Sequence, residues 1–133
     1  MDFEYKEQKA RILVIEDEIG NQKYLQLILK KKYDLDFCDN EKSMYDRLSK
    51  TDYNAIIMDI SLKDGDNGVD LIIDLKQKSA YRDIPVICLS AYSYGPDKRK
   101  AEQAGVDIYL TKPVGQKVLL NALDDLIIRN FSV

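Results

Sequence analysis

The chain has 133 residues, which is the size of one compact domain, and a formal net charge of −3 from 20 basic and 23 acidic residues. This near balance leaves no basic field to attract nucleic acid and no polybasic anchor for a membrane surface. Residues 1–10 lack the apolar centre of a secretory signal and no run of about 18 apolar residues occurs, so we expect a cytoplasmic protein.

Short apolar runs alternate with longer amphipathic stretches along the chain, and this alternation predicts five strands and five helices. Asn40 is expected to cap the second helix, Gly95-Pro96 to open the fourth and Gly105 to close it. In chain order we predict a strand at 12–15, a helix at 20–32, a strand at 33–37, a helix at 40–49, a strand at 55–58, a helix at 69–77, a strand at 86–89, a helix at 96–104, a strand at 106–110 and a helix at 114–129.

The five predicted strands fall into two kinds. The runs at 12–15, 55–58 and 86–89 are continuously apolar, which is typical of strands covered on both faces of a parallel sheet. The runs at 33–37 and 106–110 alternate apolar with polar residues, which indicates edge strands. The pattern therefore predicts an α/β fold of the flavodoxin-like (βα)₅ type in strand order 2-1-3-4-5, whose ligand site lies beyond the C-terminal ends of the strands.

The predicted helices differ in how much apolar surface they offer. The fourth has only alanines as apolar contacts, so we expect it to be the least stable helix and a mobile partner surface. The last carries a broad stripe that we interpret as core packing rather than a partner groove. Its residues are Val118, Leu119, Ala122, Leu123, Leu126 and Ile127.

Histidine is absent from the sequence, which excludes a Cys/His zinc site and a Ser–His–Asp triad. Any phosphohistidine chemistry would need a histidine on another protein. Cys38 and Cys88 stand in apolar strand-like runs and are interpreted as buried thiols rather than as a disulfide or redox switch. The basic run at 30–32 is interpreted as the cationic end of a helix rather than a partner site.

Charged and hydroxyl side chains stand where four of the predicted strands end. Because parallel strands end at one edge of their sheet, these side chains are expected to form a single site. They are Glu16, Asp17 and Glu18 after the first strand, Asp59 after the third, Ser90 at the end of the fourth and Lys112 after the fifth. Each alone has an ordinary reading as a turn, cap or solvated residue, but the set favours a functional site.

The cluster of carboxylates calls for a cation, because neighbouring carboxylates repel one another unless one is protonated or a metal is bound. Oxygen donors without sulfur or imidazole select Mg²⁺, Ca²⁺ or Mn²⁺, and an incomplete cage favours Mg²⁺, with Mn²⁺ as an alternative. We expect Asp17 and Asp59 to be carboxylate ligands and the backbone carbonyl of Ser61 to supply a further one.

The same residues suit phosphoryl transfer. Asp59 is the candidate nucleophile that would form an aspartyl phosphate. The metal and Lys112 would neutralise charge on the transferring group, and Ser90 would donate a hydrogen bond to one of its oxygens.

The sequence resembles the response-regulator receiver domains of two-component signalling from about residue 11 to residue 129, within a single domain of residues 1–133. The resemblance rests on the motifs ILVIEDE at 12–18, AIIMD at 55–59, LSAY at 89–92 and AGVDIYLTKP at 104–113.

The resemblance implies a role for each matching residue. Asp59 is then the phosphoacceptor, Glu16 and Asp17 are the acidic metal-binding pair with Asp17 favoured as direct ligand, and Ser90 and Lys112 sense the phosphate. In the family an aromatic residue at the position of Tyr109 rotates inward on activation, and the small Ala91 leaves space for it. A Lys–Pro bond like that at 112–113 is typically cis.

Some positions depart from the family pattern. Glu16 replaces the commoner aspartate, so its metal contact is expected to be longer or water-mediated, and Ser90 stands where threonine is frequent. The loop after Asp59 is one residue longer than the commonest pattern; its residues Asp64 and Asp66 are interpreted as solvated turn residues. Ser61 and Tyr92 resemble the positions that tune dephosphorylation in the family.

The resemblance also implies partners. The phosphoryl donor is expected to be a histidine kinase, a phosphotransfer protein or a small acyl phosphate, and output is expected through the face of the fourth helix, fifth strand and fifth helix, in a monomer or weak homodimer. Such a domain is regulatory and catalyses only its own phosphorylation and dephosphorylation.

Two alternatives are left open. One is a scaffold that is never phosphorylated. The other is a receiver excised from a hybrid histidine kinase, since only four residues follow residue 129. A flavodoxin-like cofactor protein is disfavoured because the first loop is acidic, and an aspartyl phosphatase because the chain is short.

Overall fold

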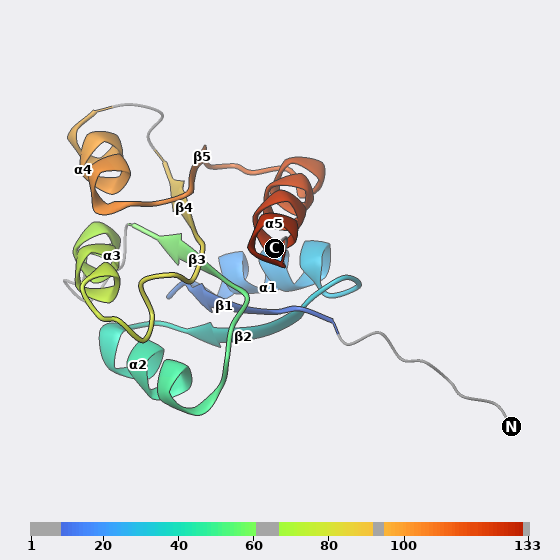
Figure 1. Ribbon diagram of the computed structural model, residues 1–133. Coiled ribbons are helices and arrows are strands. Elements are labelled where there is room, and N and C mark those ends of the chain that lie inside the picture. Colours follow the sequence, from blue (N-terminus) through green and yellow to red (C-terminus); the bar gives the residue numbers. More distant parts are fainter. Residues whose placement is uncertain (1–8, 61–66, 92–94, 132–133) are drawn as a thin grey trace, which may run out of the picture.

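The computed structural model describes residues 9–60, 67–91 and 95–131 as a three-layer α/β domain (Figure 1). Five parallel strands form one sheet in the order β2-β1-β3-β4-β5, which confirms the predicted topology. The strands are β1 (Arg11–Ile15), β2 (Asp34–Cys38), β3 (Ala55–Asp59), β4 (Val86–Ser90) and β5 (Ile108–Thr111).

The helices cover both faces of the sheet and bury two separate cores. Helices α1 and α5 pack on one face, and α2, α3 and α4 pack on the other (Figure 1). The helices are α1 (Ile19–Leu29), α2 (Glu41–Lys50), α3 (Gly68–Lys76), α4 (Pro96–Ala104) and α5 (Gln116–Phe131). Among the described residues, none of these helices combines the length and apolar character needed to cross a lipid bilayer.

Strand burial follows the apolar pattern of the sequence. Every residue of β3 and β4 is buried, and so is every residue of β1 after Arg11, whereas β2 and β5 are only partly covered. The prediction of three interior and two edge strands is therefore confirmed. Cys38 and Cys88 are both buried free thiols, also as predicted.

The predicted helix caps are present. The Asn40 side chain accepts a hydrogen bond from the Ser43 backbone amide at 2.8 Å, and the Asn40 amide donates to the Ser43 hydroxyl at 3.2 Å, so that α2 begins with a reciprocal cap. Gly105 closes α4 with a φ of +98°, a left-handed conformation that glycine adopts without steric cost. Pro96 occupies the first turn of α4.

Several predicted element ends were wrong by two or three residues. Helix α1 ends at Leu29 instead of continuing to Lys32, and Lys30 is its C-cap, while Lys32 pairs with Asp124 of α5. Helix α5 starts at Gln116 rather than at residue 114. Terminal turns are weakly determined by local sequence, which explains these shifts.

The edge strands also begin later than predicted. The Asp107 carboxylate accepts the Val86 amide at 2.8 Å, which fixes the entry to β5 so that the strand starts at Ile108. Tyr33 precedes β2 and is buried, with its hydroxyl donating to Asp124. Val118 was expected in the apolar stripe of α5 but is 54% exposed, because the buried face of α5 is centred on Leu119 and the residues three, four and seven positions after it.

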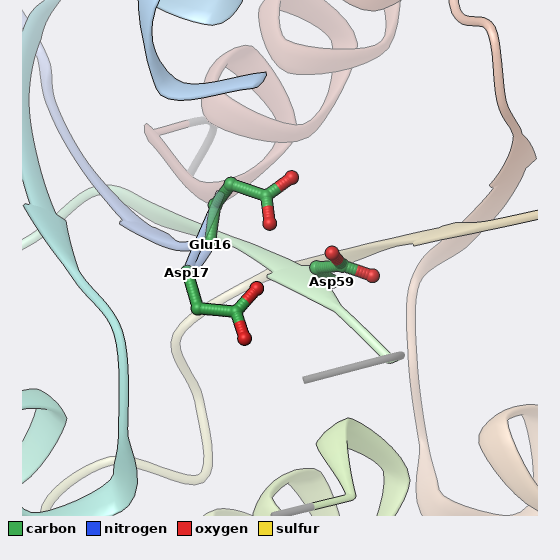
Figure 2. Close-up of side chains that lie close together, drawn as sticks. All are labelled: Glu16, Asp17 and Asp59. Atoms are coloured by element: carbon green, nitrogen blue, oxygen red, sulfur yellow. The ribbon is translucent and has the colours of Figure 1, made fainter. Parts of the chain in front are cut away.

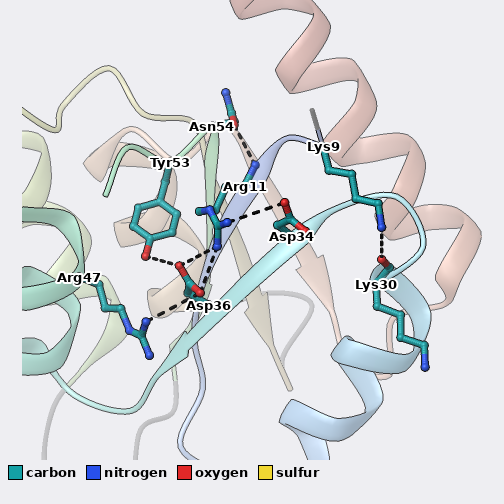
Figure 3. A network of polar contacts seen from close by, with 8 residues as sticks. All are labelled: Lys9, Arg11, Lys30, Asp34, Asp36, Arg47, Tyr53 and Asn54. Atoms are coloured by element: carbon teal, nitrogen blue, oxygen red, sulfur yellow. Dashed lines mark hydrogen bonds and ion pairs between the residues drawn. The ribbon is translucent and has the colours of Figure 1, made fainter. Parts of the chain in front are cut away.

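A charge-balanced network holds the end of the sheet where β1 and β2 begin (Figure 3). The Asp36 carboxylate lies 3.3 Å from Arg11 Nη1 and 3.8 Å from Arg47 Nη1, and accepts the Tyr53 hydroxyl at 2.7 Å. Burial and this hydrogen bond raise the pKa of Tyr53 to about 12. Asn54 accepts the Arg11 amide at 2.9 Å, so edge strand β2 is tied to β1, α2 and the approach to β3.

Helix α4 is held by little apolar contact. Ala101 is the one buried residue along this fully described helix, whereas α3 buries five. Since each buried aliphatic side chain contributes roughly 1.5–3 kcal/mol, α4 gains much less from packing than its neighbours do.

We therefore predict that the backbone amides of α4 are the least protected of the helical amides in native-state hydrogen exchange, because a weakly packed helix opens locally at low cost. Helix α5, with four buried apolar residues in its described part, serves as the internal reference. Protection factors in α4 equal to those in α5 would contradict this.

Gly68 opens α3 in direct contact with the end of β3. A Cβ at this position would lie 2.4 Å from the Asp59 carbonyl oxygen and 2.5 Å from Ile60 Cα. Both neighbours are backbone atoms, which cannot rotate away as a side chain can. Only glycine therefore allows α3 to approach the strand end that carries Asp59.

Replacing Gly68 with alanine should lower the free energy of unfolding by about 1–3 kcal/mol, because the added methyl group forces α3 away from β3. The measurement is urea unfolding. Gly20→Ala in α1 is the matched control, since its nearest contact would be at an ordinary 3.4 Å, and it should be as stable as the parent or slightly more so. Equal urea midpoints for the two variants would refute the steric argument.

Candidate functional site

The C-terminal ends of β1 and β3 bring three carboxylates together (Figure 2). Glu16 and Asp17 directly follow β1, and Asp59 is the last residue of β3. One carboxylate oxygen from each lies within 4.8 Å of the others. Glu16 is 2% exposed and Asp59 4%, so two of these acids are almost completely removed from water.

Lys112 reaches this cluster from the segment after β5. Its Nζ lies 2.9 Å from Asp59 Oδ2 and 3.6 Å from Glu16 Oε1. The peptide bond between Lys112 and Pro113 is cis, as predicted. The Lys112 amide donates to the Ser90 carbonyl at 2.6 Å, which fixes the lysine backbone beside the end of β4.

The remaining predicted residues lie at the end of β4, within β5 or outside the described residues. Ser90 is fully buried at the end of β4, and Ala91 follows it in an exposed position. Tyr109 in β5 is half-buried against the α2–α4 core, with Lys98 Nζ 5.9 Å from its ring centroid. The expectations for Ser61, Asp64, Asp66 and Tyr92 lie outside the described residues.

The electrostatics of the cluster are dominated by burial. Burial, a hydrogen bond with Asp59 and the negative charge of Asp59 raise the pKa of Glu16 to about 7, although the positive charge of Lys112 opposes this. Burial lowers the pKa of Lys112, but the hydrogen bond and charge of Asp59, with the charge of Glu16, outweigh it and leave that pKa raised. The charged form of Lys112 is therefore favoured, whereas the charged form of Glu16 is disfavoured.

The donor set fits a hard divalent cation. The candidate ligands are carboxylate oxygens from Glu16, Asp17 and Asp59, which suit Mg²⁺ or Mn²⁺. A cation there would oppose both the cost of burying these charges and the repulsion from Asp59 that together raise the pKa of Glu16. One carboxylate beside both a cation and an ammonium group is also the arrangement that phosphoryl transfer needs, because that chemistry depends on positioning and charge neutralisation.

Two polar contacts shape the site without having been predicted. Gln22 in α1 donates from Nε2 to the Glu16 carbonyl at 2.6 Å, and the Glu18 amide lies 3.4 Å from a Glu16 carboxylate oxygen. Together they hold the turn from β1 into α1. A polar residue one turn into the helix after the acidic pair was the only signal in the sequence, and it is too common to identify a function.

Comparison with known sequences agrees with this geometry. The family model of the response regulator receiver domain matches residues 12–124. The sensory/regulatory protein RpfC of Xanthomonas campestris pv. campestris is 37% identical over 119 residues, which cover 87% of this chain and 16% of RpfC. The chain thus spans a small part of that relative. The transcriptional regulator KdpE of Escherichia coli is 35% identical over 110 residues, which cover 80% of this chain and 46% of KdpE.

Solved structures show the same likeness. The receiver domain of a signal transduction histidine kinase from Syntrophus aciditrophicus superposes with a TM-score of 0.85 at 28% identity, over 93% of this chain and 94% of that one. The receiver domain of a sensor histidine kinase from Pseudomonas aeruginosa PAO1, described with a magnesium ion coordinated in its active site cleft, gives a TM-score of 0.81 at 26% identity, over 90% of this chain and 98% of that one.

The buried Glu16 predicts a pH-dependent stability of the metal-free protein. The pKa of Glu16 is about 7 in the folded protein and 4.5 in its ordinary state. Its contribution to the stability of the folded protein is therefore fully present below pH 4.5 and is lost as the pH rises through 7. Glu16→Gln, which mimics the protonated form, should therefore exceed the parent in unfolding free energy by about 2–3 kcal/mol near pH 8 and by about 1 kcal/mol or less near pH 5.

The measurement is urea unfolding in the presence of a chelator at both pH values. Glu18→Gln makes the same chemical change at an exposed neighbouring position and should show little difference from the parent at either pH. A gap between Glu16→Gln and the parent that does not change with pH would contradict the argument.

Proposed function

Since this chain belongs to the response regulator receiver domain family of two-component signalling, we propose that it is a switch phosphorylated on Asp59 in a Mg²⁺-dependent reaction. The observation that carries the proposal is the 2.9 Å contact between Lys112 Nζ and the buried Asp59 carboxylate, beside Glu16 and Asp17. An unshielded aspartate would be a poor nucleophile toward an anionic phosphoryl group, because like charges repel. The ammonium group and a divalent cation remove that barrier.

The proposed metal site uses Asp17 and Asp59 as direct ligands and Glu16 as a direct or water-mediated one. The Ser61 carbonyl, which lies outside the described residues, is proposed as a further ligand. Bound Mg²⁺, or Mn²⁺ in its place, would neutralise charge on the phosphoryl oxygens and align the group with Asp59. The chain's own part is to hold its carboxylates close enough together that they need the cation.

The proposed switch uses groups on β4 and β5. Phosphorylation adds about −1.5 to −2 charges and strong acceptor oxygens at Asp59. The Ser90 hydroxyl would donate to one of these oxygens and Lys112 would pair with another. Movement of Ser90 would let Tyr109 turn inward past the small Ala91, which would change the face formed by α4, β5 and α5.

The phosphoryl donor is proposed to be another protein, because the chain contains no histidine. A histidine kinase or a phosphotransfer protein would supply the phosphohistidine, in the cytoplasm, and a downstream protein would bind the α4–β5–α5 face. A receiver domain from a histidine kinase is among the matching structures, which supports a domain of a larger hybrid kinase, and a stand-alone regulator is the alternative. We propose a monomer or weak homodimer without nucleic-acid contact.

The test is incubation with acetyl phosphate and Mg²⁺ followed by intact-mass measurement. We expect the mass to increase by one phosphoryl group, and we expect no increase in Asp59→Asn or in the presence of a chelator. Lys112→Ala should be phosphorylated at least about tenfold more slowly, because a charge-assisted contact is lost.

The main rival is a receiver-like scaffold that is never phosphorylated. An unchanged mass for the parent would support the scaffold and reject the proposed switch. A phosphoryl adduct that persists in Asp59→Asn would place the acceptor elsewhere.

A further inference from the structure

The segment that carries Lys112 and the start of the helix that follows it are each tied to α1. The Tyr24 hydroxyl donates to the Val114 carbonyl at 2.7 Å, and Gln116 donates from Nε2 to the Ile28 carbonyl at 3.1 Å. The first tie joins α1 to the connection between β5 and α5, and the second joins α1 to Gln116, the first residue of α5. This connection begins immediately after the strand that ends with Thr111 and contains the cis bond to Pro113.

Lys112 therefore stands between two anchors. On its N-terminal side its own amide is bonded to the Ser90 carbonyl of β4 at 2.6 Å. On its C-terminal side the buried Val114, two residues away, is bonded to Tyr24 of α1. A lysine side chain has four rotatable bonds, so where its ammonium group spends its time depends on how firmly its backbone is held.

Both partners of the Tyr24 bond line a groove that the site residues Glu16 and Lys112 also line. A cavity of about 380 Å³ lies between α1 and the β5–α5 connection, with Glu16 and Lys112 at its lining. Its walls are mainly apolar, from Tyr24, Leu25, Leu89, Pro113 and Val114. Apolar walls offer the connection few hydrogen bonds, so the Tyr24 hydroxyl supplies a directional bond to it from α1.

We propose that Tyr24 is a positioning residue that acts through Val114 to hold Lys112 against Asp59. The proposal rests on the proposed phosphorylation of Asp59 and adds a residue of α1 to the groups that set its rate. The Tyr24 hydroxyl touches neither Asp59 nor a phosphoryl group; it limits the excursions of the β5–α5 connection. In this way Tyr24 helps to keep Lys112 Nζ at 2.9 Å from Asp59 Oδ2.

Tyr24→Phe tests this with the smallest possible change, since only the hydroxyl is removed and residue 24 is already 42% exposed. We expect phosphorylation by acetyl phosphate at saturating Mg²⁺ to slow by about two- to tenfold, the range expected for one neutral hydrogen bond. The concentration of Mg²⁺ that gives half the maximal rate should stay close to the parent value, because Asp17 and Glu16 are unchanged.

A double-mutant cycle with Lys112→Ala separates positioning from a general structural effect. If Tyr24 acts through Lys112, Tyr24→Phe should slow the parent but have no further effect in the Lys112→Ala background. Equal slowing in both backgrounds would overturn the proposal. Tyr45→Phe is the matched control, because its hydroxyl donates to Asp74 on the opposite side of the sheet, and it should leave the rate unchanged.

A crystal structure of Tyr24→Phe gives a readout independent of phosphorylation. We expect the β5–α5 connection to shift or to have raised displacement parameters, and Lys112 Nζ to leave hydrogen-bond distance of Asp59. A parent that takes up no phosphoryl group would reject the proposed function, and the position of Lys112 in this structure would then decide the role of Tyr24. An unchanged Lys112 would reject that role in either case.

Discussion

The contact between Lys112 and Asp59 is the interaction on which the site depends. Burying an unpaired carboxylate is costly, and the rim of the sheet buries Asp59 and Glu16 almost completely, beside Asp17. Burial, with the hydrogen bond and the negative charge of Asp59, keeps the pKa of Glu16 raised even with Lys112 3.6 Å away. The folded chain thus keeps an excess of negative charge where a divalent cation would be most strongly bound.

The two ends of the sheet differ in how their charged side chains are balanced. At the end where the strands begin, Asp36 meets Arg11, Arg47 and the Tyr53 hydroxyl, so that its charge and lone pairs are matched (Figure 3). At the end where they finish, the acids outnumber the described cation within contact distance. The first arrangement ties an edge strand to its neighbours, and the second offers a set of oxygen donors that suits a divalent cation. Their contrast supports a site at the C-terminal rim independently of any motif.

Sequence determines the layout of this fold because strand burial and strand order follow from apolar continuity. The runs in β1, β3 and β4 are uninterrupted, so their interior position was predictable, and that position places Asp59 beside the acidic turn after β1. The ends of elements were less predictable, because they depend on contacts such as the one from Asp107 to Val86. Val118 was misjudged since a broad apolar stripe does not reveal where its centre lies.

The candidate site also contains residues that could be predicted from the sequence and residues that could not. Residues that touch the acid cluster carry charges at strand ends and can be found by position alone. Residues that hold those groups in place, such as Gln22 and Tyr24, act through backbone carbonyls. A carbonyl is present at every residue, so no pattern of side chains marks the ones that will be used. The close approach of Gly68 to β3 is likewise set by tertiary packing.

The weak packing of α4 explains how a change at Asp59 could reach a surface some distance away. Tyr109 packs against the core under α4, and Lys98 of α4 lies over its ring. If Tyr109 changes position, it loses the Lys98 contact and alters the space beneath the one buried residue of the helix, Ala101. A methyl group contributes less than about 1 kcal/mol of burial, so repositioning α4 costs little beside the free energy available from new charge-assisted hydrogen bonds at the phosphoryl group. A helix packed like α3 would resist the same change, so the sparse core contact of α4 is what makes it suited to respond.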